Sequence, residues 1–133
     1  MQIEIKHSPA FASATVTLSP NEQVKAEAGA MIMKTPSVNI ETSTQGGFMK
    51  GLKRSFGGES FFMNTFTAGP QGGEVAFAPT LAGDIVTWTL SGQTVFLQSG
   101  AYLASAMGVE VDSKWGGAKT FFSGEGLIVP LEA

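Results

Sequence analysis

The sequence predicts an all-β domain, either a sandwich or a barrel, from three observations. Hydrophobic and polar residues alternate with a period of two along most of the chain, as they do in half-buried strands. Turn residues interrupt this alternation every few positions, which indicates many short strands. One pattern of residues occurs twice, which indicates a duplicated structural unit. The 133 residues suffice for a single domain, 1–133, with a core of its own.

The alternation predicts strands along the whole chain, separated by turns rich in Gly, Pro, Asn and Ser. The predicted strands are 14–18, 24–26, 31–33, 38–42, 60–67, 74–78, 85–90 and 94–98. Residues 101–107, A-Y-L-A-S-A-M, have some helical character. The matching segment of the first half contains Pro36, which disfavours a helix. We therefore predict a strand followed by a turn in both places.

The duplicated pattern has an offset of 71 residues over most of its length. The matched pairs are Val24/Val95, Gly29/Gly100, Ala30/Ala101, Val38/Val109 and Glu41/Asp112. Further along, residues 51–62 resemble residues 117–128 at an offset of 66. We predict two tandem pseudo-repeats, about 7–68 and 77–133, whose strands superpose.

Gly29 and Gly100 occupy matching places inside apparent strands. A glycine in a strand marks a bulge or a close approach of another backbone, where a Cβ atom would clash. We therefore expect crowding around both residues.

The two units differ in the length of one loop. Eight residues separate Thr42 from Gly51, whereas three separate Ser113 from Gly117. The longer loop contains the cationic segment Gly46–Arg54. Its candidate interaction residues are Phe48, Met49, Lys50, Leu52, Lys53 and Arg54. Such a loop could dock a protein partner or an anionic membrane surface. The alternative is a loop whose apolar residues pack locally or across a subunit interface.

Glu59 and Glu125 follow a glycine at corresponding places in the two units. Two carboxylates related by an internal pseudo-symmetry could face each other and act as an acid and a base, or hold a cation. The alternative is that each accepts hydrogen bonds from turn amides, or pairs with the lysine six residues earlier. The sequence leaves both alternatives open.

The composition excludes several kinds of chemistry. The chain has no cysteine and one histidine, His7, so thiolate chemistry, Cys-ligated zinc and multi-histidine metal sites are excluded. No nucleotide-binding or hydrolase motif is present, and we predict no catalytic residue, metal or cofactor. The net charge of −3 disfavours nucleic acid as a partner. The first residues lack the features of a signal peptide, and we expect a bacterial cytoplasmic protein.

Charged residues make up 14% of the chain, compared with roughly 25% in ordinary globular proteins. So few charges on so many strands predict an apolar face that is buried between subunits. We expect a homo-oligomer, either a trimer or a dimer. Trp88 and Trp115 are expected to be core or interface residues.

Five segments together resemble the altered-inheritance-of-mitochondria family. They are H-S-P-A-F-A-S, A-E-A-G-A-M, G-G-E-S-F-F-M-N-T-F, Q-S-G-A-Y-L-A-S and F-S-G-E-G-L. The resemblance implies a fold similar to that of the tryptophan RNA-binding attenuation protein, an antiparallel β-sandwich of the double-stranded β-helix kind. It supplies no catalytic or ligand-binding residues. Members usually continue beyond the last segment, and a missing third unit is expected to leave an open sheet edge.

Three classes of function follow from these patterns. The first is a noncatalytic structural or interaction module that works as a homo-oligomer. The second is a small-molecule or nucleic-acid binder that uses a groove between subunits. The third is an enzyme that uses Glu59 and Glu125. We favour the first, because the low charge and the repeat predict an assembly while no motif predicts a reaction.

Overall fold

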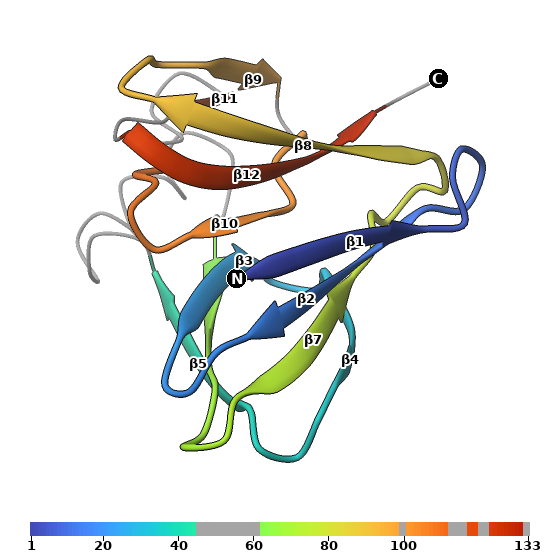
Figure 1. Ribbon diagram of the computed structural model, residues 1–133. Coiled ribbons are helices and arrows are strands. Elements are labelled where there is room, and N and C mark those ends of the chain that lie inside the picture. Colours follow the sequence, from blue (N-terminus) through green and yellow to red (C-terminus); the bar gives the residue numbers. More distant parts are fainter. Residues whose placement is uncertain (45–61, 99–100, 112–116, 120–122, 132–133) are drawn as a thin grey trace.

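The computed structural model describes residues 1–44, 62–98, 101–111, 117–119 and 123–131 (Figure 1). Within these ranges the chain forms twelve strands and no helix, which confirms the predicted all-β class. The strands are β1 (Gln2–Lys6), β2 (Ser13–Leu18), β3 (Gln23–Glu27), β4 (Met31–Lys34), β5 (Asn39–Thr44), β6 (Phe62–Thr67), β7 (Gly73–Phe77), β8 (Asp84–Ser91), β9 (Phe96–Gln98), β10 (Ala104–Ala106), β11 (Gly117–Lys119) and β12 (Ser123–Leu131).

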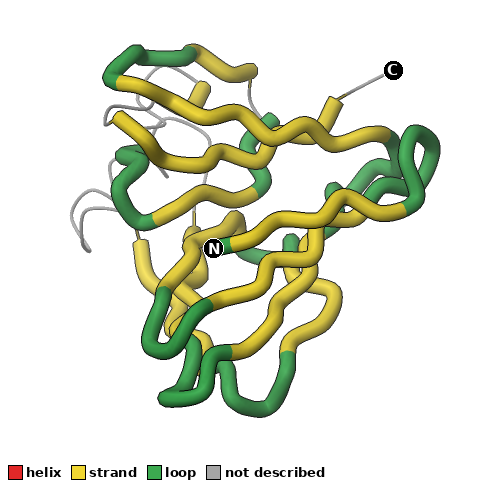
Figure 2. Tube along the Cα trace, in the orientation of Figure 1, coloured by secondary structure: helices red, strands yellow, loops and turns green. Residues whose placement is uncertain are grey.

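Two antiparallel sheets form the body of the domain. The smaller sheet has the order β1-β2-β7-β4, and the larger has the order β5-β6-β3-β10-β12-β8. β9 and β11 form a separate two-stranded ribbon. Figure 2 shows that strand fills most of the trace, with short loops between the strands. The larger sheet joins strands of both predicted units, because β10 pairs with β3 on one side and with β12 on the other.

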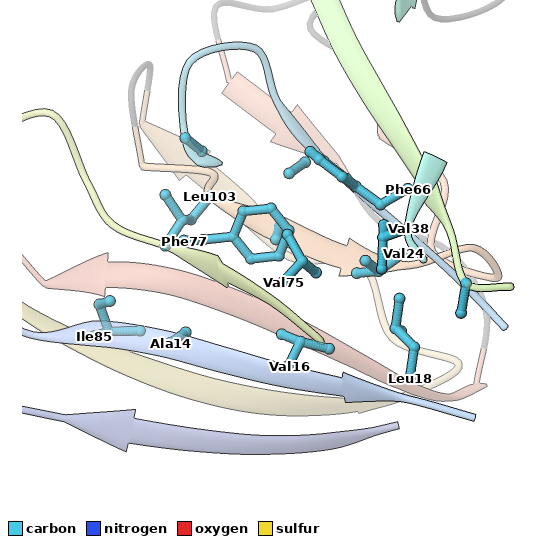
Figure 3. Packing of buried hydrophobic residues seen from close by; sticks show 14 of the residues in the cluster. Ala14, Val16, Leu18, Val24, Val38, Phe66, Val75, Phe77, Ile85 and Leu103 are labelled. Carbon is cyan, nitrogen blue, oxygen red and sulfur yellow. The ribbon is translucent and has the colours of Figure 1, made fainter. Parts of the chain in front are cut away.

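The two sheets pack face to face around one large core. In β2, Ala14, Val16 and Leu18 face the core and are buried, as the period of a strand requires. On the opposite face Thr17 is exposed and Thr15 is buried. The core-facing side chains of β2 and those of β7 meet Val24 and Phe66 from the larger sheet (Figure 3). The sandwich arrangement predicted from the sequence is therefore confirmed.

Phe66 and Phe77 link the two layers directly. Phe66 comes from β6 of the larger sheet and Phe77 from β7 of the smaller one. Their ring centroids are 5.3 Å apart with an interplanar angle of 73°, which is an edge-to-face contact. Both rings are fully buried, so this pair joins the sheets at the centre of the core.

A second, smaller hydrophobic cluster lies apart from the first. It contains Met63, Leu90, Tyr102, Val109 and Val111. Four of these five residues come from the second half of the sequence, whereas most of the larger cluster comes from the first half. Met63 and Phe66 belong to the same strand but to different clusters, because an odd spacing along a strand places side chains on opposite faces.

The prediction for Gly29 was wrong. Gly29 lies in the turn between β3 and β4, not inside a strand. Its φ is +91°, and a Cβ there would meet nothing within 4 Å. Glycine is therefore favoured by its left-handed backbone and not by crowding. Close approaches occur at Gly72 and Gly73 instead, where a Cβ would lie 2.6 Å from the backbone oxygen of Leu18 and 2.6 Å from Cγ2 of Val38, respectively. Gly100 lies outside the described residues.

Candidate functional site

Most of the residues predicted as sites lie outside the described part of the chain. Phe48, Met49, Lys50, Leu52, Lys53 and Arg54 of the candidate interaction loop do so, and so does Glu59. The backbone of Glu125 lies in β12, where its Cα is opposite that of Leu90. The carboxylate pair and the docking loop therefore stay predictions.

The structure instead reveals a buried polar group on the larger sheet. Lys25 of β3 and Ser105 of β10 are opposite each other in the antiparallel ladder, so their side chains share one face. Ser105 has no exposed surface, and only 6% of Lys25 is exposed. Tyr102, which precedes β10, is also buried. Polar residues rarely sit so deep without partners.

Hydrogen bonds hold two members of this group in place. The hydroxyl oxygens of Tyr102 and Ser105 are 2.7 Å apart. The Tyr102 hydroxyl also lies 3.4 Å from the backbone carbonyl oxygen of Lys25, to which it donates. The ring of Tyr102 packs in the second hydrophobic cluster. The phenol therefore connects the second hydrophobic cluster, by hydrogen bonds, to both β3 and β10.

Lys25 is the basic member of the group. Within the described residues its ammonium makes no hydrogen bond or ion pair. Burial lowers the pKa of Lys25, and the negative charge of Glu110 opposes this effect. Loss of water destabilises the charged amine, and a lysine with a lowered pKa can bind an anion or act as a neutral amine.

Burial also shifts the pKa values of the carboxyl and phenol groups near Lys25. Burial raises the pKa of Glu27, which lies two residues from Lys25 in β3. Burial also raises the pKa of Tyr102; the hydrogen bond with Ser105 opposes this shift and the charge of Glu27 adds to it. The phenol is therefore a fixed hydrogen-bonding group at neutral pH and not an acid.

Sequence reasoning missed this group because the alternation in V-K-A places Lys25 on the polar side of a strand. A polar side is usually assumed to face water, but this one also carries Ser105. The available signal was Tyr102 and Ser105 within the apolar segment A-Y-L-A-S-A. Neither residue indicates burial of Lys25 until the β3–β10 pairing is known.

The described residues contain no group of three or more His, Asp or Glu that could hold a metal ion. They also contain no helix long and apolar enough to cross a membrane. The surface does expose several large apolar side chains. Phe11, Leu81 and Phe96 are 73%, 75% and 72% exposed.

Comparison with known proteins places the chain in a family. The family model described as mitochondrial biogenesis AIM24 matches residues 3–131. No curated protein matches the chain. Among solved structures, protein SPYM3_0169 from Streptococcus pyogenes is similar, with a TM-score of 0.71 and 23% sequence identity. At this identity the likeness concerns the fold alone. The alignment covers 97% of this chain and 63% of that one, so the chain spans less than two thirds of the length of that protein. The match over nearly all of its residues shows that the chain belongs to the mitochondrial biogenesis AIM24 family.

Proposed function

We propose that the chain is a noncatalytic structural or interaction module that works as a homo-oligomer. The observation that carries the proposal is the exposure of Phe11 and Leu81, which are 73% and 75% exposed. Single exposed apolar residues are common, but gathered ones mark surfaces that bind other proteins.

Phe11 and Leu81 come from segments that lie against each other. The amide of Ala12 donates to the carbonyl oxygen of Gly83 at 2.8 Å. The hydroxyl of Ser8 donates to a carboxylate oxygen of Asp84, also at 2.8 Å. Figure 1 shows the turn after β1 beside the segment that enters β8. The two exposed side chains therefore belong to one corner of the domain, which supports a contact surface there.

Sedimentation of Leu81→Asp tests this proposal. Because Leu81 is exposed, the variant keeps the fold, and a charge in an apolar contact weakens association. Thr80→Asp is the matched control, since Thr80 is also exposed and adjacent. We expect the oligomer to dissociate at higher concentration for Leu81→Asp than for Thr80→Asp. Equal behaviour of both variants and the wild type would place the contact elsewhere, and a monomeric wild type would contradict the proposal.

A second candidate function is the binding of a small anionic molecule. The observation that favours it is the buried Lys25 ammonium, which has no ion pair among the described residues. Mass spectrometry of the small molecules released by denaturing the purified protein tests it. A molecule that accompanies the wild type and is absent from Lys25→Met would support this function. An enzyme that uses Glu59 and Glu125 stays a prediction, since Glu59 lies outside the described residues.

The loop Gly46–Arg54 remains a proposed docking segment for a protein or an anionic membrane surface, on the strength of its sequence. Replacing Lys50, Lys53 and Arg54 by Glu should abolish binding to phosphatidylserine vesicles, because the attraction depends on these charges. Equal vesicle binding by wild type and variant would remove this proposal. We propose the cytoplasm as the compartment, since the chain has no cysteine.

A further inference from the structure

Within the described residues the two large sheets end in four edge strands, each of which contains at least one charged residue. β1 contains Glu4 and Lys6, β4 contains Lys34, and β5 contains Glu41. The register of β4 is also shifted where it pairs with β7. Charged residues and irregular pairing are the ordinary means by which an edge strand avoids pairing with another chain.

β8 has these protections only at its ends: Asp84 is its first residue, and the register of its pairing with β12 shifts between Ser123 and Glu125, opposite Ser91 and Leu90. It is the longest of the four edge strands, with eight residues, and no charged residue lies between Asp84 and Ser91. Within the described residues β8 pairs with β12 alone, from Asp84 to Ser91. Its central residues Val86 and Trp88 are 38% and 44% exposed. One side of β8 therefore offers backbone groups flanked by apolar and β-branched side chains, which favours addition of a strand.

We propose that β8 pairs antiparallel with β8 of a second copy of this chain, so that two six-stranded sheets join into one continuous sheet. The proposal deepens the homo-oligomeric function above and rests on it. A strand that pairs with itself about a two-fold axis makes an isologous contact, which closes as a dimer. Of the two predicted assemblies, the dimer follows from this geometry.

Side-chain chemistry selects the register of the pairing. With Thr87 opposite Thr87 of the second copy, each Val86 lies opposite the other copy's Trp88. Pairs of an aromatic with a β-branched residue and pairs of threonines are both favourable across antiparallel strands. The same register places Asp84 opposite Leu90 of the second copy.

The charges are compatible with this register. The two Asp84 carboxylates are six residues apart along the joined ribbon, which is about 20 Å at the rise of a strand. That separation exceeds the distance over which exposed charges repel at physiological salt. Pairing of two β8 strands therefore brings no two like charges close together. Self-pairing of β5 centred on Glu41 would instead place two carboxylates side by side.

The absence of cysteine allows a direct test, because one introduced cysteine can form a disulfide only between copies. Thr87→Cys and Thr89→Cys place the thiol on the same face of β8, and both threonines are exposed. In the proposed register the two Thr87 Cα atoms lie within disulfide range, whereas the two Thr89 Cα atoms lie about 14 Å apart. We expect a mild oxidant to convert nearly all Thr87→Cys into a covalent dimer and little of Thr89→Cys.

The outcomes separate this inference from the proposed function. Cross-linking of Thr89→Cys at the rate of Thr87→Cys, or failure of Thr87→Cys to cross-link while the wild type is oligomeric, overturns the β8 contact and leaves the homo-oligomer standing. A monomeric wild type overturns both. Val86→Lys supplies an independent test, since a charge on the edge strand should make the variant dissociate under conditions in which the wild type is oligomeric. An unchanged circular dichroism spectrum would show that the variant is folded. An oligomer that withstands Val86→Lys also contradicts the proposal.

Discussion

Val38 and Val109 make the same local structure in the two halves of the chain. The amide of Val38 donates to the carbonyl oxygen of Thr35 at 3.1 Å, and the amide of Val109 donates to that of Ala106 at 3.1 Å. Both side chains are fully buried, Val38 in the larger cluster and Val109 in the smaller one. The two residues are a matched pair of the predicted repeat, so each unit uses the same turn to direct a valine into a core.

Val38→Ala and Val109→Ala should each destabilise the protein by about 2 kcal/mol, since each removes two buried methyl groups and leaves a cavity. Urea unfolding of the two variants measures this loss. Ile32→Ala is the control, because Ile32 is 59% exposed, and it should cost about 0.5 kcal/mol or less. A negligible effect of Val109→Ala would show that the smaller cluster does not contribute a packed core.

The contact between Phe66 and Phe77 should be measurable as a coupling between the two sheets. Each single change to Ala should cost about 3–5 kcal/mol. The double variant should lose less than the sum of the two by about 0.5–1.5 kcal/mol, which is the usual contribution of an edge-to-face pair. Additive losses in this double-mutant cycle would mean that the rings contribute only their buried area.

Tyr102→Phe should destabilise the protein by about 1–2 kcal/mol, because it leaves the buried hydroxyl of Ser105 without the phenol oxygen 2.7 Å away. Ser105→Ala tests the other side of the same bond. Because the two hydroxyls form a hydrogen bond with each other, the double variant should be about as stable as Tyr102→Phe alone. Independent losses at the two positions would refute the role assigned to this hydrogen bond.

Lys25→Met should raise the free energy of unfolding at neutral pH, because burial disfavours the ammonium in the folded state. The sign of the pH dependence follows from the lowered pKa. Between that pKa and the ordinary value of 10.5, the unfolded chain binds a proton that the folded chain does not, so stability rises with pH. Below the lowered pKa both states are protonated and the full penalty is present.

Urea unfolding of Lys25→Met and wild type across this alkaline range measures the difference. The wild type should gain stability with pH relative to the variant, so the difference between their free energies of unfolding should narrow. Lys6→Met, at the exposed end of β1, controls for the loss of one positive charge. A widening gap would contradict the assignment of Lys25 as a buried ammonium that has no ion pair with any described residue.

Most of the strands that obey a simple alternation were predicted from the sequence. All eight predicted strands coincide with observed ones, and 101–107 contains β10 followed by a turn. β1, β11 and β12 were not predicted, although Q-I-E-I-K in β1 does alternate. In β12, Gly124, Gly126 and Pro130 are poor strand residues. The structure shows why Pro130 is tolerated: β10 pairs with β12 only at Leu127 and Ile128. At Pro130 the strand therefore has a ladder partner on one side, Ile85 of β8, and a missing N–H is accommodated there.

The buried polar group could not be predicted in the same way. Its position depends on the pairing of β3 with β10, which are about 80 residues apart in the sequence. Local alternation states that Lys25 and Val24 lie on opposite faces. It does not state that both faces of the larger sheet are covered, which the second cluster at Met63 and Tyr102 accomplishes.

Light scattering of the wild-type protein at micromolar concentration tests the central claim, that this domain is an assembling module, most directly. The claim predicts a mass that is a multiple of the 13.9 kDa chain, and the β8 contact predicts twice that mass. A single species at the mass of one chain, unchanged over a hundredfold range of concentration, would contradict the account.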